Sequence, residues 1–327
     1  MLRVLGVAAL AAAVVVSAAG AAGPHLLRTA RPADAAPQSG PNVLTQLWHV
    51  VAIDRRTQAA VDLRVDSLGS DTGAQLQYWP GAPHQGFSQT FSNLGPPGSA
   101  PGFAARNLTL AYAGGRWTLT FDQSNAKGTL TFTSVRPGPT AASWPLGTIS
   151  GPGTPTYLST YAWSVPVAAA RVTGTLELDG RRVDLSGWAG YVDHTWGRFD
   201  PSGPLMQHWD WAVAEDATGA WIVDGFESGT GTTKWKAHDD LWSGVLVHVA
   251  GGRAVFCRTR AVRGMWTEAY AGGVAQFLYP RTLVATCGGM RVALARTKRV
   301  AGAGTAETET SVTTSRGGYG LWDERVG

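Results

Sequence analysis

Apolar and polar residues alternate with a period of two along much of this chain. The alternation runs through residues 107–112, 116–121 and 128–132, with the pair Gly114-Gly115 between the first two segments. Successive side chains of a β-strand point to opposite faces of a sheet, so each segment predicts a strand with one buried and one exposed face. The Gly-Gly pair is typical of a tight hairpin turn. These residues therefore predict a three-stranded antiparallel meander.

The same period continues to the end of the chain. Residues 172–178 and 182–185 predict a hairpin joined by Asp179-Gly180, a favoured turn pair. Further strands are expected at 209–214, 221–226, 244–249, 255–260, 283–286 and 292–296. No amphipathic helix of four turns is found, which argues against α/β architectures with Gly-rich phosphate loops. The Pro- and Gly-rich segments 81–104 and 137–155 are expected to be long loops. The predicted fold class is all-β.

The length of 327 residues, with 44% hydrophobic content, predicts two domains. Arg3, the apolar run 4–16 and the small residues that follow indicate an export signal. We assign residues 1–36 to this signal and a flexible lead-in, 41–200 to a first domain and 201–327 to a second. The two candidate cleavage sites are Ala19-Gly-Ala21 and Ala33-Asp-Ala35, and an uncleaved anchor is the alternative. The expected location is outside the cell or in its envelope.

The charge pattern narrows the class of partner. The formal net charge is +4, and no Lys/Arg cluster of the kind that binds nucleic acid is present. We therefore expect a hydrophobic small-molecule substrate and no nucleic acid, and leave open a peripheral membrane contact and the oligomeric state. The chain has only Cys257 and Cys287, outside any Cys-x-x-Cys pattern, so redox catalysis is not expected. A disulfide and two buried thiols both fit them.

The residues 188–197 and 209–211 place ionisable groups among aromatic ones. Asp193 and His194 lie between tryptophans in the first segment, and Asp210 lies between two tryptophans in the second. A carboxylic acid held in an apolar pocket has its charged form disfavoured, so its pKa rises and it stays a proton donor near neutral pH. Aromatic ring faces also stabilise a cation. The pattern therefore indicates a buried proton-transfer site.

Strand geometry sorts these residues into faces. If 188–196 is extended, Trp188, Gly190, Val192, His194 and Trp196 share one face, and Tyr191, Asp193 and Thr195 share the other. By the same rule Trp209 and Trp211 face together and Asp210 faces oppositely. Ile222, Asp224 and Phe226 are aligned in the next strand, and an Asp between two apolar neighbours on one face is costly unless it is paired or used.

The block Gly190-Tyr191-Val-Asp193-His194-Thr-Trp196-Gly197, followed by Trp209-Asp210-Trp211, resembles the lipocalin-like hydratases and cyclases that include carotenoid 1,2-hydratase (hydroxyneurosporene synthase). Weaker matches are Tyr279-Pro280-Arg281-Thr-Leu283, Glu309 and Gly318-Tyr319-Gly-Leu-Trp322. The resemblance implies two lipocalin-like antiparallel β-barrels side by side, a hydrophobic cavity, and no metal or organic cofactor. It also implies that Asp224 protonates an isoprenoid double bond while His194 and Trp196 line the site. The hydratases carry a Tyr where this chain has Ile222.

Three activities follow as hypotheses. The leading one is a cofactor-independent hydratase, a carbon-oxygen lyase, that protonates a C=C bond of an isoprenoid or polyene substrate and adds water. The second is a terpenoid or polyketide cyclase, including pericyclic ring closure of the Diels-Alder type, which depends mainly on orientation. The third is a non-catalytic lipid carrier. The expected catalytic residues are Asp224, His194, Trp196 and Asp210, with Trp188, Tyr191, Trp209, Trp211 and Phe226 binding substrate. Asp193 is expected to be structural, satisfying backbone donors or pairing with Arg198.

Overall fold

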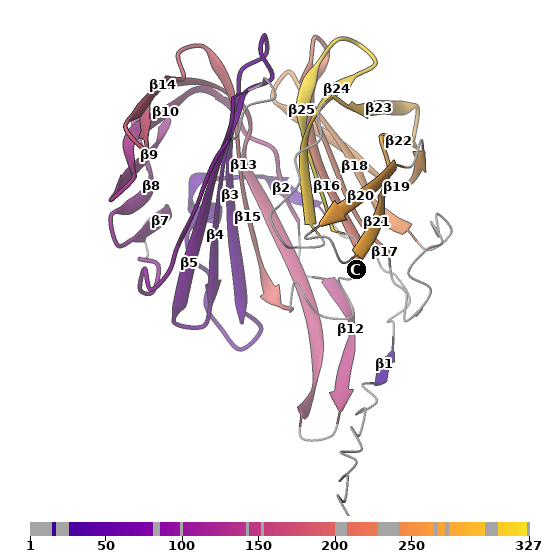
Figure 1. Ribbon diagram of the computed structural model, residues 1–327. Helices are drawn as coiled ribbons and strands as arrows, with labels where there is room; N and C mark the ends of the chain where they lie inside the picture. The colour runs from indigo at the N-terminus through magenta and orange to yellow at the C-terminus, as the bar shows by residue number, and fades with distance from the viewer. Residues whose placement is uncertain are drawn as a thin grey trace, which may run out of the picture.

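The computed structural model of this protein describes residues 15–17, 26–80, 86–98, 101–141, 144–151, 154–199, 208–227, 242–264, 267–271, 275–297 and 307–325. These residues are almost entirely antiparallel β-structure, and the short 3-10 helix η1 (Pro32–Ala35) is their only helical element. The strands form two barrel-like sheets that lie side by side (Figure 1). The predicted all-β fold with two lipocalin-like domains is confirmed.

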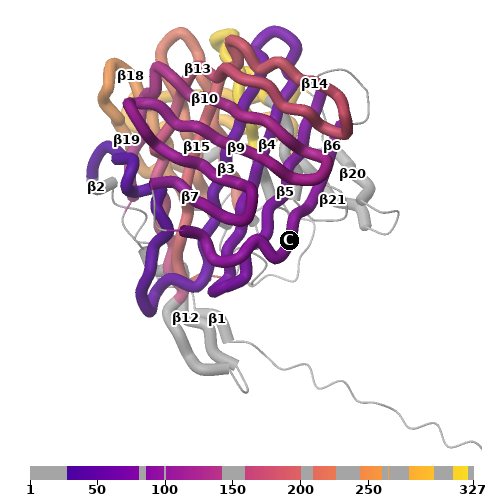
Figure 2. Tube along the Cα trace, turned by 90° about the vertical axis from the view of Figure 1, so that its left-hand side faces the viewer, coloured from indigo at the N-terminus to yellow at the C-terminus, as the bar shows by residue number. Residues whose placement is uncertain are grey.

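The first sheet is 15-stranded, and its main path runs β6-β5-β4-β3-β15-β13-β10-β9-β8-β7. The strands of this path are β3 (Thr45–Ile53), β4 (Ala60–Leu68), β5 (Asp71–Trp79), β6 (Phe87–Phe91), β7 (Gly102–Ala105), β8 (Leu108–Ala113), β9 (Arg116–Gln123), β10 (Ala126–Arg136), β13 (Thr154–Leu178) and β15 (Trp188–Arg198). Off the path lie β1 (Val15–Ser17), β2 (Leu26–Thr29), β11 (Pro139–Ala141), β12 (Trp144–Gly151) and β14 (Arg181–Asp184). Figure 2 looks onto this sheet, which curls so that β9 and β10 lie in front of β3 and β4.

The second sheet is a closed barrel in the order β16-β17-β18-β19-β22-β23-β24-β25. Its strands are β16 (His208–Asp216), β17 (Gly219–Glu227), β18 (Trp242–Ala250), β19 (Arg253–Gly264), β22 (Thr282–Cys287), β23 (Met290–Arg296), β24 (Glu307–Thr314) and β25 (Tyr319–Arg325). A separate hairpin is formed by β20 (Thr267–Ala271) and β21 (Ala275–Tyr279). The strands predicted between 209 and 296 are confirmed as β16 to β19, β22 and β23.

Both predicted hairpins of the first sheet are confirmed. Asp179 and Gly180 have φ values of 48° and 74°, and Gly114 and Gly115 have 56° and 78°. Two successive positive φ values give a turn whose twist matches the twist of the flanking strands. The turn residues therefore position β13 against β14 and β8 against β9.

Two segments expected as loops contain strands. β6 and most of β7 fall within 81–104, and β11 and β12 fall within 137–155. β12 pairs with the 25-residue β13, and the register of this pair shifts beside Pro145. β1 pairs with β12 only at 148–150, so at Pro145 the sole partner among the described strands is β13. Proline is tolerated at such an irregular edge because no partner strand needs its missing N–H. The strands were missed because backbone pairing holds them without an alternating sequence.

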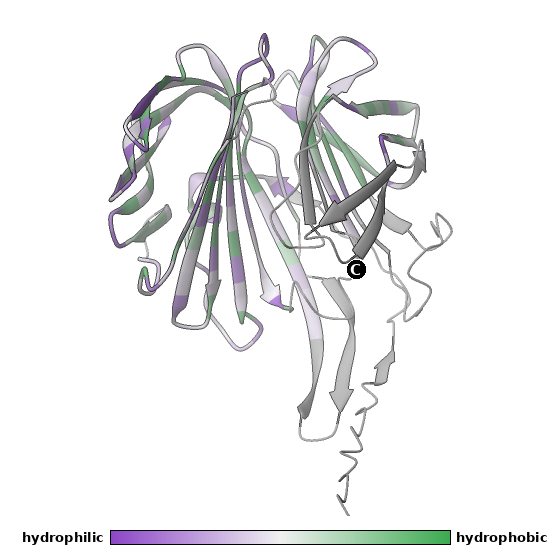
Figure 3. Cartoon of the chain, in the orientation of Figure 1, coloured by the Kyte–Doolittle hydropathy of each residue, from purple (hydrophilic) through white to green (hydrophobic). Residues whose placement is uncertain are grey.

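Three clusters of buried side chains hold the molecule together. The first fills the curled first sheet with side chains that include Trp48, Phe103 and Trp117. A second lies inside the closed barrel around Trp322. The third lies where the outer faces of the two sheets meet, and includes Trp163 of β13. Figure 3 shows hydrophobic and hydrophilic residues alternating along the strands, as two-faced strands require.

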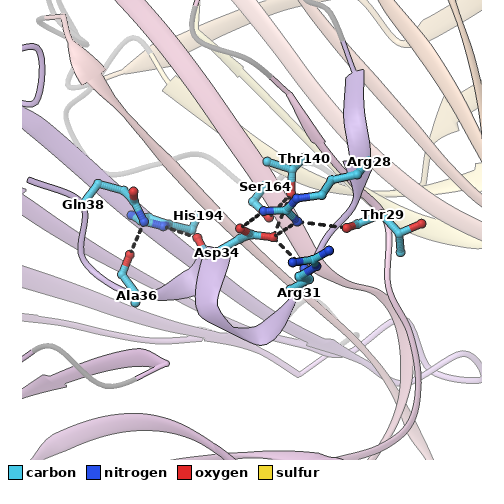
Figure 4. Close-up of polar contacts among 9 residues, drawn as sticks. All are labelled: Arg28, Thr29, Arg31, Asp34, Ala36, Gln38, Thr140, Ser164 and His194. Carbon is cyan, nitrogen blue, oxygen red and sulfur yellow. Dashed lines mark hydrogen bonds and ion pairs between the residues drawn. The ribbon is translucent and has the colours of Figure 1, made fainter.

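Residues 26–36, expected as part of a flexible lead-in, are instead ordered. β2 pairs with β11, and Ala35 of η1 is fully buried in the first cluster. The indole N–H of Trp48 donates to the Ala35 carbonyl at 2.7 Å. The Arg28 guanidinium holds the Asp34 carboxylate with two contacts of 2.6 Å (Figure 4). Because β11 and Trp48 lie outside this segment, its local composition gave no sign of this order.

Cys257 of β19 and Cys287 of β22 form a disulfide, with their Cα atoms 6.0 Å apart. This resolves the alternative left open by the sequence. In the part of the chain that the structure describes, no helix has the length and apolarity needed to cross a membrane.

Candidate active site

The predicted motif at 188–197 lies on β15, and the two faces of this strand contact different clusters. Trp188 belongs to the interior cluster of the first sheet, and His194 stacks on Trp48 of that same cluster. Tyr191 belongs to the cluster between the two sheets, and Asp193 on the same face lies near His49. The face assignment made from the sequence is confirmed. The motif therefore serves two separate environments.

Asp224 lies in the contact between the two sheets. It occupies β17 directly opposite Trp211 of β16, and it is 2% exposed. Trp163 of β13 reaches across from the first sheet and donates its indole N–H to Asp224 Oδ2 at 2.8 Å. Ile222 shares the outer face of the barrel with Asp224, as the sequence predicts, and is fully buried in the cluster between the sheets. The carboxyl is thus held in an apolar wall with one directed donor.

A second hydrogen bond crosses the contact in the opposite direction. Trp211 of the barrel donates its indole N–H to the Tyr191 hydroxyl of the first sheet at 3.0 Å. The Trp163 and Trp211 rings pack edge to face, with centroids 5.5 Å apart and planes at 82°. Each sheet thus supplies one tryptophan whose N–H bonds to the other sheet. Such a ring pair is a favourable aromatic geometry, and the arrangement fixes Asp224 against a rigid aromatic wall.

Burial raises the pKa of Asp224 well above its usual range. The indole N–H of Trp163 opposes this rise, whereas the negative charges of Asp193 and Asp210 add to it. An ionised carboxylate in an apolar site is costly, so the neutral acid is the stable form there. Burial therefore favours the protonated form of Asp224, which can give up its proton to a strong enough base.

Two phenols line the same contact. Burial raises the pKa of Tyr161 and of Tyr191 well above the usual range, and the negative charge of Asp193 adds to both shifts. The Tyr191 hydroxyl is also hydrogen bonded to the Asp193 side chain. Thr195 is hydrogen bonded to Tyr161 and lowers its pKa. Both phenols are neutral, so the carboxyl groups are the acids and bases of this compartment.

His49 of β3 lies between two buried carboxylates. Its Nε2 is 2.5 Å from Asp62 Oδ1 on β4, and its Nδ1 is 3.6 Å from Asp193 Oδ2 on β15. Asp62 is also 3.5 Å from the Arg64 guanidinium. His49, Asp62 and Asp193 are 4%, 1% and 2% exposed. Buried charged groups are stable only when paired, and this cluster pairs them.

His49 and Asp62 were not among the site residues predicted from the sequence. A signal was present, because residues 47–53 form an almost continuous apolar run with His49 inside it. Such a run predicts a strand that is buried on both faces, so its one ionisable side chain had to be buried too. Asp62 lies between Val61 and Leu63 in the next strand and carries the same signal.

The structure does not bring His194 and Trp196 to Asp224. His194 stacks on Trp48 with centroids 4.4 Å apart, and its Nδ1 lies 2.9 Å from the Asp34 carbonyl oxygen (Figure 4). The Trp196 ring lies 5.0 Å from the His194 ring. Burial lowers the pKa of His194 to about 4, so the ring is neutral near pH 7. The prediction that His194 lies among tryptophans is confirmed, but these rings belong to the interior of the first sheet.

Asp210 lies inside the closed barrel. The indole N–H of Trp322 donates to Asp210 Oδ1 at 2.9 Å, and the Arg296 guanidinium lies 3.9 Å from the centre of the Trp322 ring. Asp210 is 1% exposed. It faces away from Trp211, as the sequence predicts. Its contacts make it the acceptor for the barrel's own tryptophan.

The remaining predicted binding residues are spread over the molecule. Trp209 packs partly buried against the cluster between the sheets, whereas the Phe226 side chain lies outside the described residues. A hollow between the sheets, walled in part by Tyr191, Glu215 and Tyr319, has a volume of about 30 Å³. This volume is enough for a water molecule, and Asp224 is not among the residues that line the hollow. Among the described residues, no group of three or more His, Cys, Asp or Glu side chains could hold a metal ion.

Comparison with known proteins gives a structural match. No protein-family model matches the sequence. No curated protein matches it either. Kievitone hydratase from Nectria haematococca is similar in structure, with a TM-score of 0.55 and 13% identity over 86% of this chain and 88% of that chain. An AttH-type protein from Nitrosomonas europaea has a TM-score of 0.54 and 15% identity over 86% of this chain and 92% of that chain. CghA has a TM-score of 0.56 and 14% identity over 96% of this chain and 98% of that chain. The chain therefore shares the two-barrel lipocalin-like fold of these proteins.

Proposed function

We propose that this protein is a hydratase that protonates a C=C bond of a hydrophobic substrate, with Asp224 as the proton donor. The observation that carries the proposal is the Asp224 carboxyl itself, which is 2% exposed and bonded to Trp163 Nε1. Its pKa is raised chiefly by burial. A neutral carboxylic acid in an apolar setting is the donor that acid catalysis of an unactivated alkene needs.

The tryptophans beside Asp224 suit the second requirement of this chemistry. Protonation of a trisubstituted alkene gives a tertiary carbocation, which must be stabilised without being trapped. The faces of Trp163 and Trp211 can each stabilise a nearby cation by roughly 0.5–2 kcal/mol. The hydrophobic cluster around Asp224 supplies aliphatic and aromatic side chains that do not add to a cation as nucleophiles.

The comparison with kievitone hydratase supports the reaction class, because a protein named for hydration shares the fold. The isoprenoid or polyene nature of the substrate is our proposal, and it comes from the sequence resemblance around Asp193 and His194. In this proposal the roles expected of His194 and Trp196 pass to residues between the sheets. His194 contacts Trp48 and Trp196 through its ring, and we assign His194 and Trp196 to packing of the first sheet.

The test is incubation of the purified protein with lycopene, squalene and geraniol in H₂¹⁸O, with products analysed by mass spectrometry. We expect one substrate to gain a single labelled water. The Asp224→Asn variant should bind that substrate with little change and lose turnover by about 10²- to 10⁴-fold. Asp184→Asn, on the exposed β14 hairpin, is the matched control and should keep full turnover.

Three results would overturn the proposal. An isomeric product without label would identify a cyclase. Tight binding without any product would identify a carrier. Full turnover by Asp224→Asn would remove this acid from the mechanism, whatever the product.

A further inference from the structure

The outer face of the first sheet carries a row of polar side chains that leads away from Asp224. Asp193 of β15 is directly opposite His49 of β3, and His49 is directly opposite Arg64 of β4. Asp62 lies two positions from Arg64 on the same face and approaches His49 Nε2 to 2.5 Å. The row therefore starts in the contact between the sheets and extends across three strands.

We infer that Asp62, His49 and Asp193 form a relay that takes the proton released by the attacking water and returns it to Asp224. The inference rests on the proposed hydration. Asp193 is the carboxylate nearest the reaction, His49 holds the proton behind it, and Asp62 is the positioning residue that orients the imidazole. Asp193 thereby has a chemical role beyond the structural one expected from the sequence.

The proton balance of the cycle requires such a group. Asp224 gives its proton to one alkene carbon, and the π electron pair forms the new C–H bond. Water then attacks the cationic carbon and forms a C–O bond, and the resulting oxonium must lose one proton. Asp193 accepts that proton and passes it to His49 Nδ1. After the alcohol leaves, the proton returns through Asp193 to the Asp224 carboxylate, so the net reaction adds one water to one alkene.

The geometry around His49 fits the relay. The 2.5 Å contact makes His49 Nε2 the donor to Asp62, and this leaves Nδ1 facing Asp193. At 3.6 Å the second contact is longer than a hydrogen bond, so transfer needs a shift of a few tenths of an ångström or a bridging water. A carboxylate that fixes the tautomer of a base is a recurrent catalytic arrangement. Arg64, 3.5 Å from Asp62, favours the ionised form of that carboxylate.

Several ionisable groups surround His49 and must be considered in any pH profile. From the two strands beside it, the groups on its face are Asp62, Arg64, Asp66, Asp193 and Tyr191. Asp66 is exposed, whereas the other acids are buried. Substitution of His49 alone isolates its contribution from theirs.

The kinetic test uses His49→Gln and Asp62→Asn in the full chain. The substrate is whichever of lycopene, squalene and geraniol the wild type turns over fastest. We expect kcat to fall at least tenfold in both variants with KM little changed, and the acidic limb of the pH profile to move in each. His248→Gln, on β18, is the matched histidine control and should behave as wild type. The double variant His49→Gln/Asp62→Asn removes both charges, so it serves if a single variant does not fold.

A second measurement needs no substrate. In ¹⁵N-histidine spectra of the wild type near neutral pH, we expect the fixed proton of His49 on Nε2, which faces Asp62. Asp62→Asn should disturb this tautomer. The relay is overturned if Nδ1 holds the fixed proton, or if His49→Gln matches His248→Gln while Asp224→Asn is inactive. Full activity of Asp224→Asn would instead show that the proposed hydration has failed.

Discussion

Trp163 of the first sheet donates its indole N–H to Asp224 of the closed barrel, 2.8 Å away, so the acid of one sheet is oriented by the other. In the other direction, Trp211 of the closed barrel donates its indole N–H to Tyr191 of the first sheet. The acid therefore acquires its final environment only when the two sheets pack together. Neither sheet alone provides both the carboxyl group and its donor.

Replacing Trp163 by Phe tests this relationship. The bond from Trp163 lowers the pKa of Asp224, so its loss should raise that pKa further. The protonated acid would then persist to higher pH, and the basic limb of the kcat/KM profile should move upward. Loss of the buried bond should also cost about 1–3 kcal/mol of unfolding free energy. A pH-rate profile and urea unfolding measure the two effects.

The control for this variant is Trp117→Phe, which truncates a tryptophan inside the first sheet. It should lower stability and leave the pH profile in place. If Trp163→Phe also leaves the basic limb unmoved, the acid seen in the profile is not Asp224.

Stability should also depend on pH through His194. Burial lowers its pKa from the model-peptide value of 6.5 to about 4, so the unfolded chain binds the proton more readily than the folded chain. The contribution of the neutral His194 ring to the unfolding free energy is therefore fully present above about pH 6.5, and it is lost as the pH falls toward 4. The fall in pKa corresponds to about 3 kcal/mol. Unfolding free energies of wild type and His194→Gln across this range should converge as the pH is lowered, and parallel curves would contradict the assignment.

Sequence periodicity was enough for most of the fold. The alternation in 116–121 and 209–214 and the turn pair Asp179-Gly180 predicted strands and hairpins correctly, because each depends on local backbone preference and on burial of one face. β6, β7, β11 and β12 could not be found in this way. Pairing with neighbouring strands holds them, and that information lies elsewhere in the chain.

The candidate site was predicted in pieces. Alternation identified Asp224 as a buried acid on an apolar face, and it separated His194 from Asp193 correctly. It could not show that Asp193, rather than His194, lies in the compartment of Asp224, because that depends on which outer faces of the two sheets meet. His49 was missed for a different reason, because it lies in a nearly continuous apolar run that shows no alternation.

The disulfide should stabilise the barrel appreciably. Cys257 and Cys287 are 30 residues apart, and the bridge ties β19 to β22. A bridge of this span limits the freedom of the unfolded chain and contributes about 2–4 kcal/mol. Cys257→Ser/Cys287→Ser should therefore unfold at lower urea concentration, while the first sheet keeps its own contacts. Equal midpoints for the variant and the oxidised wild type would contradict this expectation.

The segment around η1 leads to a prediction about export. We propose that the chain is exported and cleaved after Ala21 and not after Ala35. The second site would remove Asp34 and Ala35, whose carbonyl groups are the partners of His194 Nδ1 and the Trp48 indole. Each buried donor left without an acceptor costs about 1–3 kcal/mol. The cavity left by the fully buried Ala35 would add to this cost.

Two shortened chains measure this cost directly. A chain beginning at Ala22 should match the full-length protein in stability, whereas one beginning at Ala36 should lose about 2–6 kcal/mol. In the shorter chain the His194 ring becomes accessible to water, so its pKa should return toward 6.5. The intact mass of the protein secreted from its own host identifies the site that is used. Secretion of a stable chain that begins at Ala36 would show that η1 is dispensable and would reverse the assignment.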